Sequence, residues 1–226
     1  MLKGATAIED LTVPFLGTDL HTQNPQEEAR LETLVAGDFN FRVGILESLR
    51  TVRVLKGNVV GQYCFINCAN LSEVYLPDTI TEIGYYAFSR SGIKEIGLLP
   101  NLVTLSDHAF DGSAIEQITL PDSLTSIGES CFTFCRNLKS IAFPDSLQHI
   151  GQAAFMECGL ENKSILLPAS VISCGDAVFS GCKNLEEIVV ESGNAYYTAV
   201  DGILYSADMS KLISVPGKIT GKISVP

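Results

Sequence analysis

The sequence of 226 residues contains no tryptophan and unusually little charge. Charged residues make up 18% of the chain and hydrophobic residues 46%, whereas an average soluble domain carries roughly 25% charged residues. The chain also lacks the roughly 18 to 20 consecutive apolar residues that a membrane-spanning helix needs. We therefore expect no membrane insertion, and the apolar surplus has to be buried inside the fold.

Basic residues are also few. The 15 lysines and arginines face 26 aspartates and glutamates, which gives a formal net charge of −11 and an isoelectric point near 4.6. Nucleic acids bind proteins largely through basic side chains on their phosphates, and anionic membrane surfaces attract clusters of lysine and arginine. The composition therefore excludes nucleic acid as an expected partner and disfavours a charged membrane surface.

The N-terminal residues 1–6 lack the basic segment, apolar run and small-residue cleavage site of a secretory signal. Two interpretations remain open on composition alone. The protein is cytoplasmic, or the chain begins after a signal that has been removed.

An internal repeat organises most of the chain. Six phenylalanines recur at intervals of 22 to 24 residues, and each follows a small or medium side chain. An aliphatic-glycine pair, such as Ile127-Gly128, precedes most of them by four or five residues. The phenylalanines are Phe65, Phe88, Phe110, Phe132, Phe155 and Phe179. A period in this range is typical of a solenoid.

Between successive phenylalanines lies a short element of the form L-x-x-I-x-L-P. It occurs at Leu71–Pro77, Ile115–Pro121 and Leu138–Pro144. Its apolar residues alternate near the end, which is typical of a half-buried strand. Proline cannot donate a hydrogen bond to a neighbouring strand, so the proline should end it. The pattern predicts one short strand in each of these elements, followed by a polar turn.

A unit of about 23 residues with one short strand cannot bury its own apolar face and must stack on its neighbours. Successive strands would then pair in parallel about 4.8 Å apart, with equivalent residues one above the other. We expect the phenylalanines to form one buried ladder. The glycines should mark places where a side chain does not fit or φ is positive.

The two ends depart from this pattern. Residues 8–14 and 49–54 each read as a strand, and the longer connection between them predicts a helix over 25–36 that covers the first coil. Near the other end, a turn at Asp201-Gly202 should join two strands. We expect one continuous solenoid domain with atypical repeats in 1–57, regular repeats in 58–190, and a hairpin-like element plus the start of another repeat in 191–226. Because the chain stops where the pattern calls for another phenylalanine, it looks like a segment of a longer array.

The repeat units Ile127–Leu147 and Ile83–Phe88 closely resemble the BspA-like leucine-rich repeats of bacterial surface proteins. This resemblance implies a β-rich α/β solenoid: a right-handed superhelix with one short parallel strand in each coil. It also implies a secreted or surface-displayed protein whose repeats mediate adhesion, and it implies no catalytic residues.

The seven cysteines allow three interpretations: buried thiols, one disulfide, or a metal site. The two close pairs, Cys64-x3-Cys68 and Cys131-x3-Cys135, have neither the spacing nor the histidines of a structural zinc site. Four cysteines lie three residues after the repeated phenylalanine, where other copies carry serine: Cys68, Cys135, Cys158 and Cys182. This interchange favours small buried thiols, and thiol titration of the denatured chain should then find all seven.

Catalysis and metal binding receive little support. His21, His108 and His149 occupy different places in the repeat, so they are not expected to converge with a nucleophile and an acid. Acidic pairs such as Glu186-Glu187 could in principle hold calcium, but no D-x-[DN]-x-[DN]-G loop is present. We predict no catalytic residues, no metal site and no cofactor, with the acidic residues forming a solvated surface.

The functional surface is predicted from the strands. Strand residues that alternate with buried ones should point toward the concave side of the stack, which repeat proteins commonly use for binding. Tyr75 is the one aromatic residue there, and with Arg53 it is the best local candidate. The alternative is that these residues simply face solvent. The candidate binding residues are Arg53, Glu73, Tyr75, Glu95, Gln117, Thr119, Ser140 and Glu187.

These observations lead to a non-catalytic protein-binding or adhesion module of a secreted or cell-surface bacterial protein. The expected partner is a protein or glycoprotein on host matrix or on other cells. The alternative function is a structural spacer that displays another domain away from the cell. An enzyme would need a further domain outside the repeats, and the oligomeric state is not predicted.

Overall fold

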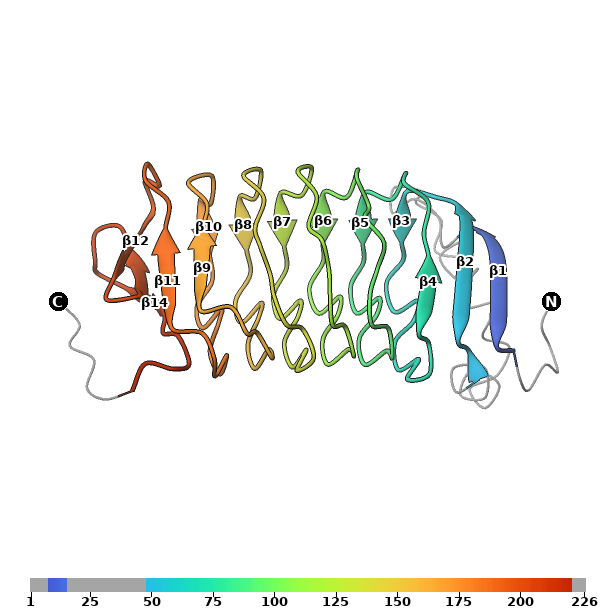
Figure 1. Ribbon diagram of the computed structural model, residues 1–226. Coiled ribbons are helices and arrows are strands. Elements are labelled where there is room, and N and C mark those ends of the chain that lie inside the picture. The colour runs from blue at the N-terminus through green and yellow to red at the C-terminus, as the bar shows by residue number, and fades with distance from the viewer. Residues whose placement is uncertain (1–7, 16–47, 221–226) are drawn as a thin grey trace.

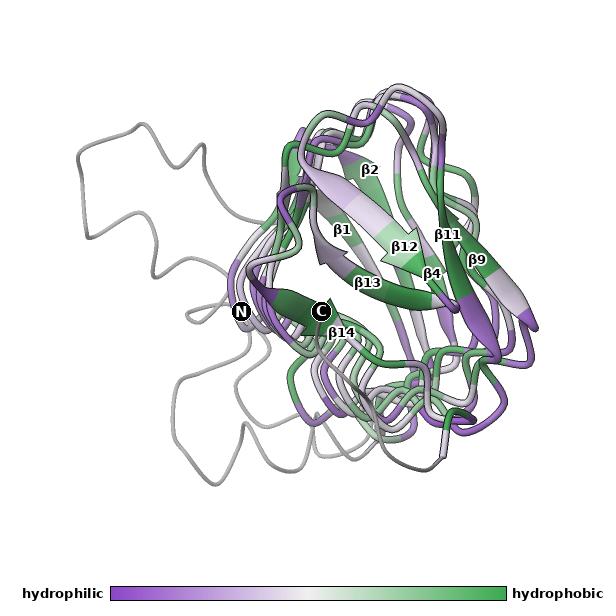
Figure 2. Ribbon diagram, turned by 90° about the vertical axis from the view of Figure 1, so that its left-hand side faces the viewer, coloured by the Kyte–Doolittle hydropathy of each residue, from purple (hydrophilic) through white to green (hydrophobic). Residues whose placement is uncertain are grey.

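The computed structural model describes residues 8–15 and 48–220, and it shows a solenoid whose coils stack along one axis (Figure 1). In Figure 1 the stack runs nearly straight, and in the end-on view of Figure 2 the coils lie largely over one another. The predicted helix over 25–36 lies outside the described residues. Almost no helix occurs in the part of the chain that is described, so the α/β component of the expected fold is wrong there.

Two sets of parallel strands run along the stack. One sheet of six short strands contains the aliphatic-glycine position of each repeat, with Leu105-Ser106 and Cys174-Gly175 as variants, in the order β10-β8-β7-β6-β5-β3. Its members are β3 (Val59–Val60), β5 (Glu82–Ile83), β6 (Thr104–Leu105), β7 (Ser126–Ile127), β8 (His149–Ile150) and β10 (Ser173–Cys174). The second set comprises β1 (Asp10–Phe15), β2 (Thr51–Lys56) and β4 (Glu73–Tyr75) in one sheet, and β9 (Ser164–Leu167) and β11 (Glu187–Val190) in another.

The prediction of one strand per coil in the L-x-x-I-x-L-P element is therefore only partly right. The continuous sheet is the six-stranded one on the other side of the coil, and the segment Leu138–Pro144 is not a strand.

One cause of the missing strand at Leu138–Pro144 is the side chain of Asn162. Its Oδ1 accepts a hydrogen bond from Ile141 N at 3.1 Å, and its Nδ2 donates to Ile141 O at 3.3 Å. The side-chain amide thus takes both backbone groups that a neighbouring strand would use.

The phenylalanine segment of each coil is a turn held to the next coil by backbone hydrogen bonds. In the fourth turn, the N–H groups of Ser130, Phe132 and Phe134 donate to the following coil at 2.9, 2.7 and 2.8 Å. The N–H groups of Thr133 and Cys135 instead donate to carbonyls three residues earlier in the same turn. Two residues per turn adopt the left-handed conformation, here Ser130 and Phe134 with φ of 51° and 59°.

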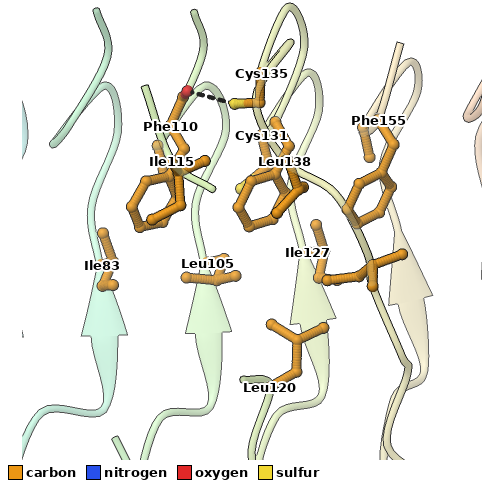
Figure 3. Packing of buried hydrophobic residues seen from close by; sticks show 14 of the residues in the cluster. Ile83, Leu105, Phe110, Ile115, Leu120, Ile127, Cys131, Cys135, Leu138 and Phe155 are labelled. Atoms are coloured by element: carbon orange, nitrogen blue, oxygen red, sulfur yellow. Dashed lines mark hydrogen bonds between the residues drawn. The ribbon is translucent and has the colours of Figure 1, made fainter. Parts of the chain in front are cut away.

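The predicted phenylalanine ladder is confirmed. Five successive ring pairs are stacked with centroid separations of 5.1, 5.3, 5.2, 5.1 and 5.6 Å and interplanar angles of 20° or less. Phe65 is 2% exposed and the other five rings are fully buried. Figure 3 shows Phe110 and Phe155 packed among the aliphatic residues of neighbouring coils, including Ile115 and Leu138.

The cysteines form part of the same core. All seven are present as thiols, six of them buried and Cys64 partly exposed, so the interpretation as buried thiols is confirmed for all but Cys64. The thiols of Cys135, Cys158 and Cys182 donate hydrogen bonds to the carbonyl oxygen of the phenylalanine in the preceding coil, at 3.0, 2.9 and 3.1 Å; Figure 3 shows the bond from Cys135 to Phe110. Burial raises the pKa of Cys135 and Cys182 to about 12.

The predicted C-terminal hairpin is confirmed and is extended by a third strand. Strands β12 (Tyr197–Val200), β13 (Ile203–Ser206) and β14 (Leu212–Ser214) form an antiparallel sheet across the end of the stack (Figure 2). This sheet takes the place of a next coil. Ala177 N donates to Ile213 O at 2.9 Å, and Phe179 N donates to Ser214 Oγ at 3.2 Å.

The repeat resumes after this sheet. Ile219 N donates to Pro216 O at 3.1 Å, as Leu147 N donates to Pro144 O at 3.1 Å in a regular coil. Residues 216–219 therefore form the same turn that follows each predicted proline in the regular coils.

The repeated glycines are required by the close approach of neighbouring coils. A Cβ atom added at Gly128, Gly151 or Gly175 would lie 2.3 or 2.4 Å from a backbone nitrogen of the preceding coil. None of the three has a positive φ, so space and not backbone conformation excludes a side chain here.

Replacing Gly151 with alanine should lower the free energy of unfolding by about 2 to 3 kcal/mol, because two coils must separate to admit the methyl group. Gly97→Ala is the control, since nothing lies within 4 Å of its added Cβ, and it should change stability by less than about 0.5 kcal/mol. Urea denaturation followed by circular dichroism measures both. Equal effects at the two sites would contradict the packing argument.

Truncating a ladder phenylalanine should be costly, whereas truncating its exposed neighbour should not. We expect Phe132→Ala to lower the free energy of unfolding by about 3 to 5 kcal/mol. Phe134, two residues further on, is 45% exposed, so Phe134→Ala should cost less than about 1 kcal/mol. Thermal and urea denaturation of both variants test this, and a Phe132→Ala cost below that of Phe134→Ala would rule out the ladder as the core.

Replacing Cys135 and Cys182 with serine should reduce the loss of stability at alkaline pH. The pKa of each thiol rises from 9.0 to about 12 in the fold. The folded state therefore holds the protons more tightly, and this stabilisation is complete below about pH 9 and lost as pH rises toward 12. Within that window each thiol contributes a slope of about 1.4 kcal/mol per pH unit.

The measurement is urea denaturation between pH 8 and 10.5 for the parent and the double variant. Serine already occupies the equivalent place at Ser91 and Ser113, which makes it the natural replacement. Parallel stability curves for the two proteins would show that the thiols do not carry the alkaline dependence.

Candidate binding surface

One flank of the stack, here called the strand face, is formed by outward residues of the second set of strands. It includes β1, β2, β4, β9, β11 and the equivalent segments between β4 and β9. All eight predicted binding residues are exposed on it. Because the stack runs nearly straight in Figure 1, the strand face is the side of a rod. The residues are Arg53, Glu73, Tyr75, Glu95, Gln117, Thr119, Ser140 and Glu187.

Arg53, Glu73 and Tyr75 meet at the N-terminal part of the strand face. Parallel pairing of β2 with β4 places Arg53 directly opposite Tyr75. The guanidinium carbon of Arg53 lies 3.7 Å from the centroid of the Tyr75 ring, and the Tyr75 hydroxyl donates to Glu73 Oε2 at 3.0 Å. The aromatic ring is 45% exposed and is held between a cation and a carboxylate.

A shallow hollow continues from this group toward the next coil. It is lined by residues of 72–78 and 95–99, including Tyr75, Glu95 and Leu98. Leu98 is 57% exposed because its segment, Ile93–Pro100, has one residue more than Ile115–Pro121 before the proline. The extra residue leaves an apolar side chain on the surface beside Tyr75 and Glu95.

The other predicted residues lie progressively further from this group. Gln117 adjoins it through an isolated parallel bridge to Glu95, whereas Thr119 follows Gln117 in the same segment and Ser140 lies one coil further on. Glu187 is on β11, at the far end of the array (Figure 1). The structure therefore brings together Arg53, Glu73, Tyr75 and Glu95 and leaves the others spread along the rod.

Two exposed apolar residues at the far end also lie on the strand face: Val189, which alternates with buried residues as predicted, and Leu166, which was not predicted. Val189 and Leu166 are opposite each other in the β11–β9 pair and are 39% and 52% exposed. The alternation in Ser164-Ile165-Leu166-Leu167 already indicated that Leu166 points outward. Leu98 had a signal as well, the extra residue before its proline.

The histidines of the described chain lie apart. His108 stacks on Tyr86 with a centroid separation of 4.4 Å, and His149 is exposed on β8, two coils further along. In residues 8–15 and 48–220 no group of three or more histidine, cysteine or carboxylate side chains is placed to hold a metal ion. Over the same residues, no helix has the length and apolar character to cross a bilayer.

Comparison with solved structures supports the repeat fold. A leucine-rich cell surface protein of Faecalibacterium prausnitzii is 23% identical with a TM-score of 0.66, over 93% of this chain and 55% of that one. The pneumococcal vaccine antigen PcpA is 23% identical with a TM-score of 0.57, over 99% and 51% of the two chains. This chain thus spans about half the length of these proteins. No curated protein gives a match.

A leucine-rich repeat protein of T. pallidum is more similar in sequence, with 32% identity and a TM-score of 0.55 over 64% of this chain and 69% of that one. The family model for the BspA type leucine-rich repeat region matches six copies within residues 58–186 and 103–215, which together cover more than half of the chain. The chain belongs to the BspA-type leucine-rich repeat family.

Proposed function

We propose that this chain is a non-catalytic protein-binding module of a secreted or cell-surface bacterial protein. Contact is made through the strand face, centred on Arg53, Tyr75 and the hollow beside Leu98. The partner is a protein or glycoprotein of host matrix or of another cell. Leucine-rich repeat proteins generally bind proteins and typically carry no catalytic site, and a protein of the same fold is described as a cell surface protein.

The observation that carries the proposal is that Tyr75 is exposed and yet fixed in position by its neighbours. Interfaces draw much of their energy from a few tyrosine, tryptophan and arginine residues. Binding is also favoured when such a side chain is already ordered, since less conformational entropy is lost. The 3.7 Å contact with Arg53 and the hydrogen bond to Glu73 order Tyr75 before any partner arrives.

A structural spacer is the second candidate, and the straight stack in Figure 1 favours it. Each additional coil of such a stack adds about 4.8 Å of rigid length. A spacer makes no specific contact through the strand face, so its substitution should have no effect on binding.

The test is a binding screen of the purified chain against immobilised matrix proteins, mucins and whole cells. For any partner found, Tyr75→Ala and Arg53→Ala should each weaken binding at least about tenfold, as expected of interface centres. Tyr196→Ala is the matched control, because Tyr196 is 52% exposed but lies beside the C-terminal sheet. If variants at Arg53, Tyr75 and Glu95 all bind as the parent does, the strand face is not the site, and a screen without any partner favours the spacer.

A further inference from the structure

Four aromatic rings gather on a different part of the surface, where the chain leaves the six-stranded sheet and enters the phenylalanine turns. Tyr63, Tyr85, Tyr86 and His108, here called the aromatic cluster, come from three successive coils. Tyr85 and Tyr63 are each 37% exposed. None of the four belongs to the buried ladder or to the strand face.

Three of these rings form a stack along the array. Tyr86 is parallel to Tyr63 at a centroid separation of 5.7 Å and parallel to His108 at 4.4 Å. The stack arises because all three residues lie two positions before the repeated phenylalanine, at the left-handed position of each turn. Both faces of the Tyr86 ring are therefore occupied by neighbouring rings.

Tyr85 lies across the edges of this stack. It is perpendicular, at 87°, to Tyr86, Tyr63 and His108, with centroid separations of 4.4, 5.4 and 6.0 Å. A perpendicular pair this close places the edge of one ring on the face of the other. Because Tyr63 and His108 cover the two faces of Tyr86, it is a face of Tyr85 that meets the edge of Tyr86. Tyr85 is nevertheless 37% exposed, which fits an open opposite face.

The coils that carry the aromatic cluster are acidic overall. Residues 58–136 contain nine carboxylate residues, two of which (Glu73 and Glu95) lie on the strand face, and three basic ones.

Asp107 occupies the position equivalent to Tyr85 in the next coil, three residues before the repeated phenylalanine, and Tyr86 N donates to Asp107 O at 3.2 Å. Burial, the Tyr86 hydroxyl and the Asp107 carboxylate raise the pKa of Tyr85, whereas the Tyr63 hydroxyl lowers it. Asp107 Oδ1 accepts a hydrogen bond from Glu129 N at 2.7 Å, which fixes the carboxylate in place.

We propose that the outer face of Tyr85, with Asp107 beside it, binds an arginine side chain of a partner protein. A guanidinium stacks on an aromatic face while it donates hydrogen bonds to a carboxylate. The chain already contains the stacking half of this arrangement, since Arg53 lies over the ring of Tyr75 and the Tyr75 hydroxyl donates to Glu73. At Tyr85 the aromatic and acidic groups are present and the arginine comes from outside.

The geometry favours arginine over other cations. An ammonium ion is best held when several ring faces surround it, whereas here only one face is open and the other rings present their edges. The planar guanidinium suits a single flat face and loses less hydration than a lysine ammonium does on stacking. This binding site is separate from the strand face, so the test of one surface does not decide the other.

The experiment uses a fluorescent peptide of five Arg-Gly repeats and measures its binding to the full chain by anisotropy at low salt. Peptides with lysine or with neutral citrulline in place of arginine are the comparison probes. We expect Tyr85→Ala to weaken binding of the arginine peptide at least about fivefold and Asp107→Asn to weaken it as well. Tyr85→Phe, which keeps the ring face, should bind within about twofold of the parent.

Tyr196→Ala controls for loss of an exposed tyrosine elsewhere and should bind as the parent does. Circular dichroism and thermal denaturation establish that Tyr85→Ala is folded. Equal binding by Tyr85→Ala and Tyr196→Ala overturns the inference, as does binding of the citrulline peptide as strongly as the arginine peptide. A third outcome would also overturn the inference. If Tyr85→Ala loses binding of a neutral oligosaccharide but binds the arginine peptide as the parent does, the face binds a glycan and not arginine.

Tyr75→Ala separates the two surfaces. The inference expects this variant to retain most of the arginine-peptide binding, because the site lies on other coils. If Tyr75→Ala and not Tyr85→Ala abolishes binding, the arginine site is on the strand face, so the inference fails while the proposed function stands.

Discussion

The spacing between coils is the constraint on which the rest of the structure depends. It is set in the phenylalanine turns, where three N–H groups per coil donate to the next coil, at 2.7 to 2.9 Å in the fourth turn. Successive rings are consequently held 5.1 to 5.6 Å apart, close to a stacking distance. The same spacing leaves no room for a side chain at Gly151, and it requires left-handed backbone at Ser130 and Phe134 so that alternate N–H groups point to the neighbouring coil.

This spacing also builds the surfaces that face a partner. Residues at equivalent positions of adjacent coils are brought within contact distance, so a pair far apart in sequence becomes an interaction. Arg53 reaches Tyr75 across one coil boundary, and Tyr86 reaches Tyr63 and His108 across two. Recognition groups in this chain therefore arise where two neighbouring coils carry matching side chains at one position, and not from loops that fold over a site.

Sequence periodicity was sufficient for the core but not for the pairing of strands. The Phe132 ladder, the buried thiol of Cys135 and the turn at Asp201 follow from positions that recur in every copy or from local turn chemistry. One cause of the failed strand at Leu138–Pro144 is a side chain from the next coil, Asn162, which a repeat average conceals. The Arg53–Tyr75 contact was predictable because both residues alternate with buried ones in adjacent units. The aromatic cluster is not visible in any single repeat, because its four rings come from three successive coils.

The separation between buried and outward positions makes the proposed surfaces open to direct test. Core positions hold the same few residue types in every coil, and their neighbours on both sides bury them, which accounts for the high apolar content and scarce charge of the chain. Outward positions such as Tyr75 and Tyr85 are free of that requirement and vary from coil to coil. A substitution there removes a surface group while the hydrogen-bonded turns and the ring ladder remain, so a loss of binding can be attributed to the missing contact and not to a disturbed fold.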